Sequence, residues 1–80
     1  MSGAMPQSAW VEIRDAAGEL LASIPAEING GGIYADLPAF PPGTLGTVQL
    51  CTEGDEGVFR EEAELEELPT QPLIMGVQMG

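Results

Sequence analysis

Carboxylates are the main residues of this sequence that could do chemistry. The stretch from 53 to 67 holds eight of the 13 acids: Glu53, Asp55, Glu56, Glu61, Glu62, Glu64, Glu66 and Glu67. Closely spaced carboxylates can bind hard cations, act as an acid–base pair or dock a basic protein. No histidine or lysine accompanies them, and 53–57 lacks the stricter spacing of a calcium loop. We therefore expect no catalysis and no metal site.

Two interpretations of this acidic stretch stay open. It can be the solvated face of a strand, where charge limits edge-to-edge aggregation. It can also be a docking face for a protein partner with a basic surface. An exposed aromatic side chain would strengthen such a face. The docking candidates are Glu61, Glu62, Glu64, Glu66 and Phe40.

The other reactive groups are few. Cys51 is the single cysteine, so no internal disulfide can form, and without histidine neither a zinc site nor a Cys/His nucleophile pair can be assembled. It lies in the apolar run Val48-Gln49-Leu50-Cys51 and is expected to be a small buried hydrophobe. Two arginines against 13 acids give a net charge of −11. Such a surface repels phosphates, which argues against direct nucleic-acid or membrane binding.

The length of 80 residues is that of one domain with a small core. We expect a flexible segment over residues 1–8, compatible in part with an expression remnant, and a single domain over 9–80. No apolar run approaches the roughly 20 residues that a membrane-spanning helix needs, and the first residues lack the pattern of a secretory signal. We therefore expect a cytoplasmic protein.

Apolar alternation with turn signals predicts an all-β fold. In 9–14, Val11 and Ile13 alternate with polar or amphipathic neighbours, and in 19–28 every second residue from Leu20 is apolar. Pro25 lacks an N–H, so its strand should lie at an edge or bulge there. The glycines at 30–32 predict a sharp turn. The expected strands are 9–14, 19–28, 33–37, 45–52, 58–68 and 73–79.

The run 58–68 is ambiguous. Its glutamates favour a helix by propensity, whereas Phe59, Ala63 and Leu65 share one parity, as in a strand with one wet face. The strand interpretation gives six short strands, which favours a small antiparallel sandwich or barrel. A barrel removes exposed edges, so a six-stranded antiparallel β-barrel is our fold prediction.

The order of these parts resembles a PilZ domain, a six-stranded barrel associated with bacterial cyclic di-GMP signalling. That family has a (D/N)-x-S-x-x-G turn, matched in spacing by Glu27-Ile28-Asn29-Gly30-Gly31-Gly32, with Glu27, Asn29 and Gly32 at the defining places. Pro42-Gly43-Thr44 is similar to the loop that follows, and Gly76-Val77-Gln78-Met79 to the closing strand. The resemblance covers roughly residues 19–79.

The sequence departs from the family at the residues that hold the nucleotide. Ligand-binding members carry an R-x-x-x-R motif, whose guanidinium groups bind phosphate and guanine edges. Here the nearest spacing is Trp10 to Arg14, with a single arginine, and the Asp/Asn and Ser of the turn motif are replaced by Glu27 and Asn29. The resemblance therefore implies a degenerate member with weak or absent cyclic di-GMP binding and no other cofactor.

Three functions follow. The resemblance implies a non-enzymatic regulatory or adaptor module acting through protein contacts in motility, biofilm or virulence programmes. The first alternative is a true cyclic di-GMP receptor that uses Trp10, Arg14, Glu27, Asn29 and the glycine turn. The second is an acidic phage-type or nucleic-acid-mimicking inhibitor, which only the charge supports. The partner's identity and the oligomeric state stay open.

Overall fold

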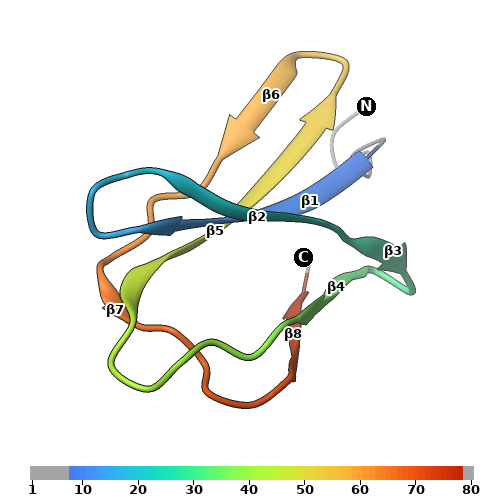
Figure 1. Cartoon of the computed structure of the whole chain (residues 1–80). Helices are drawn as coiled ribbons and strands as arrows, with labels where there is room; N and C mark the ends of the chain where they lie inside the picture. Colours follow the sequence, from blue (N-terminus) through green and yellow to red (C-terminus); the bar gives the residue numbers. More distant parts are fainter. Residues whose placement is uncertain (1–7, 79–80) are drawn as a thin grey trace.

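The computed structural model describes residues 8–78, which fold into two antiparallel sheets without a helix (Figure 1). The strands are β1 Ser8–Asp15, β2 Leu20–Pro25, β3 Glu27–Asn29, β4 Gly32–Leu37, β5 Leu45–Gly54, β6 Gly57–Arg60, β7 Glu66–Glu67 and β8 Leu73–Gln78. The all-β, antiparallel prediction is confirmed. None of these residues lies in a helix long and apolar enough to cross a membrane.

The first sheet is built around β1 and β5. Its order is β2-β1-β5-β6, and the short β7 pairs with the first residues of β5. The β1–β5 register runs without interruption from Ser8 opposite Glu53 to Asp15 opposite Gly46. The second sheet has the order β3-β4-β8. Strands β6 and β8 therefore end their sheets.

The chain passes from the first sheet to the second at Pro25 and Ala26. Strand β2 ends at Pro25, and the N–H of Ala26 donates to the carbonyl of Ala9 over 3.0 Å. Strand β3 then pairs with β4 instead of β1. The predicted run 19–28 is thus one extended segment that changes sheets at the residue after its proline. Strand β2, which ends at Pro25, is an edge strand of the first sheet, as the missing N–H predicted.

The glycine turn joins β3 to β4. Gly30 and Gly31 have φ angles of 60° and 83°, whereas Gly32 already belongs to β4. Gly32 leaves room for a side chain: a Cβ atom there would lie 2.7 Å from Tyr34 Oη, so the exposed Tyr34 side chain would have to move. The ring of Tyr34 also lies against Gly76 of β8. The sharp turn is confirmed, and its left-handed conformation is confined to the first two glycines.

The core lies between the two sheets and follows the predicted alternation. Its buried side chains come from β1, β4, β5 and the residue after β7: Ala9, Val11, Ile13, Ile33, Ala35, Leu37, Leu50 and Leu68. Leu20 shares the apolar parity of the run 19–28 but is exposed, whereas Ala22 and Ile24 pack against the core. A register shift beside Ala22 places Leu20 opposite Arg14, on the outer face of the sheet.

The run 58–68 is neither the continuous strand nor the helix considered above. It contains β6, an irregular segment over 61–65, and β7. Phe59 is 63% exposed and Leu65 56%, so the expected inward face of this run is wrong. The reason is the place of β6, which pairs with the end of β5 that projects beyond the second sheet (Figure 1). No opposing sheet covers Phe59 there.

The six predicted runs correspond to eight strands because 19–28 and 58–68 are each divided in two. In the described residues, the two sheets do not form a closed ring of hydrogen-bonded strands. No Cα atom of β8 lies within 8 Å of one in β5 or β7. The closed six-stranded barrel therefore stays a prediction.

Candidate functional site

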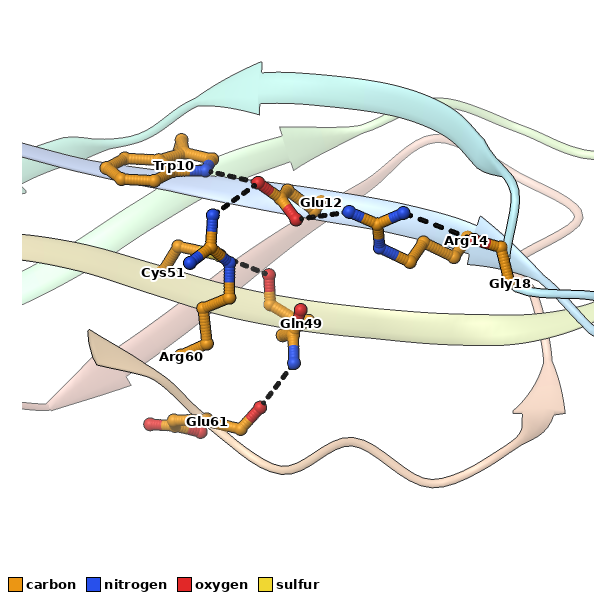
Figure 2. A network of polar contacts seen from close by, with 8 residues as sticks. All are labelled: Trp10, Glu12, Arg14, Gly18, Gln49, Cys51, Arg60 and Glu61. Carbon is orange, nitrogen blue, oxygen red and sulfur yellow. Dashed lines mark hydrogen bonds and ion pairs between the residues drawn. The ribbon is translucent and has the colours of Figure 1, made fainter. Parts of the chain in front are cut away.

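A polar network surrounds Glu12 on the outer face of the first sheet (Figure 2). Trp10, Glu12 and Arg14 alternate along β1 and so share one face. Trp10 Nε1 donates to Glu12 Oε2 over 2.9 Å, and Arg14 Nη2 to Glu12 Oε1 over 3.0 Å. Arg60 approaches from β6, with Nη2 3.6 Å from Glu12 Oε2. Both arginines of the chain thus contact one buried carboxylate.

These contacts fix the charge state of Glu12. The hydrogen bonds from Trp10 and Arg14, with the nearby charge of Arg60, hold the pKa of Glu12 below its ordinary value even though burial alone would raise it. The carboxylate is therefore ionised at neutral pH. Arg14 also donates from Nη1 to the carbonyl of Gly18 over 3.1 Å, which ties this guanidinium to the β1–β2 turn.

Cys51 lies beside this network and is fully buried, as predicted for a small hydrophobe. It is opposite Trp10 on β1 and Arg60 on β6. Burial, together with the negative charge of Glu12, raises the pKa of the Cys51 thiol. A thiol that is buried and protonated is a poor nucleophile.

The structure divides the ligand-binding residues implied by the PilZ resemblance between two sheets. Trp10 and Arg14 meet at Glu12 in the first sheet. Glu27, Asn29 and Gly32 lie in the β3–β4 hairpin of the second, where Glu27 is opposite Tyr34 and Asn29 opposite Gly32. Glu27 and Asn29 are exposed. Within residues 8–78, no hydrogen bond or ion pair joins the two groups.

The docking candidates differ in solvent exposure. Glu61, Glu62 and Glu64 are exposed in the segment between β6 and β7, and Glu66 is exposed in β7. The segment is anchored at its start, since the N–H of Glu61 donates to the carbonyl of Leu50 and Gln49 Nε2 donates to the carbonyl of Glu61. Phe40 differs from the acids because it is half-buried and packs against the core.

A groove of about 390 Å³ opens between β7 and β8. Its lining is largely apolar, with Leu37 of β4, Val48 of β5 and Leu73 and Met75 of β8. Glu66 and Glu67 of β7 complete it with carboxylates. Of these residues, only Glu66 was named from the sequence as a docking candidate.

Sequence reasoning missed Glu12, Arg60 and the groove. The alternation in β1 places Glu12 between Trp10 and Arg14, which was the available signal for a local ion pair. Arg60 lies near Glu12 because β6 pairs with β5 in a hairpin. The groove depends on the separation of the two sheets. Neither feature is encoded by residues that are close together in the sequence. Residues 8–78 contain no group of three or more acidic, cysteine or histidine side chains placed to hold a metal ion.

Comparisons of the chain with protein-family models, curated proteins and solved structures found no match.

Proposed function

We propose that this chain is a non-enzymatic PilZ-like regulatory or adaptor module of the bacterial cytoplasm that acts through protein contacts. In this proposal the two sheets are a six-stranded barrel left open between β7 and β8, and cyclic di-GMP binding is weak or absent. The main support for this proposal is that both arginines of the chain form ion pairs with Glu12.

A cyclic dinucleotide presents two phosphates, which proteins commonly bind with arginine side chains. This chain has no lysine, and its two guanidinium groups already neutralise part of an internal carboxylate. A nucleotide would have to compete with Glu12 for them in the field of a molecule with charge −11. These features support protein contacts over nucleotide binding.

The surface near the acidic stretch supports a protein partner. Large apolar side chains are exposed beside the carboxylates, with Val58 and Phe59 in β6 and Leu65 before β7. Exposed apolar groups among charges of one sign are typical of surfaces that bind another protein. The charge favours a partner with a basic surface.

Isothermal titration of cyclic di-GMP into the purified protein at low salt tests the proposal, because phosphate attraction is then least screened. We expect no heat at about 100 μM ligand and no shift of amide resonances in a parallel NMR titration. Micromolar binding would overturn the proposal and identify a nucleotide receptor.

One observation favours that receptor as a second candidate. The indole of Trp10 and the guanidinium groups of Arg14 and Arg60 gather around Glu12, and the two arginine side chains are 37% and 49% exposed. An indole can stack on a base while guanidinium groups bind phosphate. For a receptor, Arg14→Ala should abolish the heat, whereas Glu12→Gln should increase it by releasing both arginines.

Affinity capture tests directly whether the chain binds a protein partner. The double variant Glu62→Lys/Glu64→Lys reverses charge in the exposed segment, and Glu19→Lys/Asp36→Lys makes the same charge change elsewhere. We expect proteins captured by the unmodified chain from a bacterial lysate to be lost with the first variant and kept with the second. Equal loss with both variants would assign the capture to net charge alone.

A further inference from the structure

The groove between β7 and β8 is bordered by strand edges. β8 ends the second sheet and has β4 as its only strand partner in the described chain, while β7 pairs only with β5. Figure 1 shows β7 and β8 apart, joined by the loop over residues 68–72. An edge strand presents a row of N–H and C=O groups that another strand can pair with. The groove therefore combines apolar side chains with backbone groups available for pairing.

The strands that border the groove do not pair with each other. Neighbouring strands of one sheet lie about 4.8 Å apart. The Cα atoms of β8 lie more than 8 Å from those of β5 and β7. Direct backbone pairing of β8 with β5 or β7 is excluded by this separation, so in residues 8–78 the outer edge of β8 has no strand partner.

The side chains define what the added strand should carry. Leu37, Val48, Leu73 and Met75 offer an apolar floor, which favours apolar residues at every second position of the occupant. Glu66 and Glu67 border the same groove, and both arginines of the chain are bound elsewhere, at Glu12. Lysine or arginine at the other positions of the occupant would complement these carboxylates.

We propose that an extended peptide of alternating apolar and basic residues, supplied by a partner protein, binds in this groove as an added β-strand on the open edge of β8. Such strand addition gains affinity from backbone hydrogen bonds and specificity from the side-chain pockets. The inference rests on the proposed function and names the partner's chemistry. A second copy of this chain is a poorer occupant, because its own charge of −11 opposes pairing beside Glu66 and Glu67.

The test uses an octapeptide of alternating lysine and valine, with blocked ends, added to the full chain at low salt. Amide hydrogen exchange read by NMR reports which backbone groups become protected. We expect exchange in 73–78 to slow about tenfold at about 1 mM peptide. Unchanged exchange in β8 at that concentration would overturn the proposal.

Two N-methylated peptides separate strand pairing from charge attraction. One carries methyl groups on the valine nitrogens, the other on the lysine nitrogens, so each loses the N–H donors on one edge of the strand. We expect at least one to bind about tenfold more weakly than the parent peptide. Equal binding by all three would show that charge alone holds the peptide and would contradict strand addition.

A matched pair of double variants tests the groove carboxylates. Glu66→Gln/Glu67→Gln lies in the groove, and Glu19→Gln/Glu56→Gln removes the same charge at exposed positions outside it. Glu67 Oε2 accepts the N–H of Gly43 over 3.0 Å, a bond that a glutamine oxygen can also accept. We expect the groove variant to lose about threefold more affinity than the control. Equal losses would place the peptide elsewhere.

The remaining outcomes are also decisive. Protection of β8 that grows with protein concentration in the absence of peptide would identify a second copy as the occupant and contradict the proposal. Heat from cyclic di-GMP would overturn the adaptor function without changing the peptide's effect on β8. The two failures can therefore be told apart.

Discussion

The outer face around Glu12 and the groove between β7 and β8 both involve β5. They differ in how many of their polar groups have hydrogen-bond or ion-pair partners within the chain. Around Glu12, a carboxylate, an indole and two guanidinium groups satisfy one another, and no side-chain nitrogen or oxygen buried in the described structure lacks a partner. At the groove, an edge strand and apolar side chains face an opening. The difference separates a polar network whose members are paired within the chain from an apolar groove beside an edge strand.

The two regions also differ in burial. β1 is central in its sheet, and Val11 and Ile13 are shielded from solvent by the second sheet. β8 is at an edge, where Leu73 is 51% exposed and Ile74 70%. Because the free energy gained by apolar burial scales with the area removed from water, stability should be concentrated at β1.

The largest effect is expected when the unfolding free energies of Ile13→Ala and Leu73→Ala are compared. Ile13 is fully buried, so its truncation should cost about 2–5 kcal/mol of unfolding free energy through lost burial and the cavity left behind. Leu73 lines the open groove, and its truncation should cost less than about 1 kcal/mol. Urea denaturation at neutral pH measures both values. Equal costs would contradict the view that β8 contributes little to stability.

Much of this core was predictable from local pattern. The alternation of Val11 and Ile13, and of Ile33, Ala35 and Leu37, follows the period of a strand whatever its partners are. The turn at Gly30 and Gly31 was predictable for a similar reason, because positive φ favours glycine. These features depend on residues close together in the sequence.

The features that pattern did not predict depend on distant parts of the chain. Phe59 has the parity of an inward residue, but its exposure is decided by how far the second sheet extends. Leu20 is displaced by a register shift that has no clear sequence signal. Arg60 meets Glu12 only because β6 folds back on β5. The site and the groove are therefore less predictable than the core.

A smaller effect is expected from Glu12→Gln, which keeps the shape of the side chain but removes its charge. Arg14 and Arg60 are partly exposed and can be hydrated when the carboxylate is lost, which limits the cost to about 1–2 kcal/mol. Glu62→Gln is the control, because Glu62 is exposed, and should change stability by less than about 0.5 kcal/mol. If both variants unfold at the same urea concentration, the network around Glu12 does not stabilise the fold.

The smallest expected effect is the pH dependence of the stability difference between the parent protein and Glu12→Gln. The pKa of Glu12 is lowered in the folded protein, so its contribution is fully present above the pKa of an unfolded glutamate, about 4.3, and is lost as pH falls through the folded value. Protonation of the other acids relieves repulsion in a chain of charge −11 and acts in the opposite direction. The parent curve alone therefore mixes two effects of opposite sign.

Subtracting the unfolding free energy of Glu12→Gln from that of the parent at each pH removes the shared repulsion. We expect this difference to be constant near neutral pH and to shrink toward zero below about pH 4. If the difference for Glu12→Gln persists undiminished in acid, the charge that Glu12 shares with Arg14 and Arg60 is not what stabilises this face of the sheet.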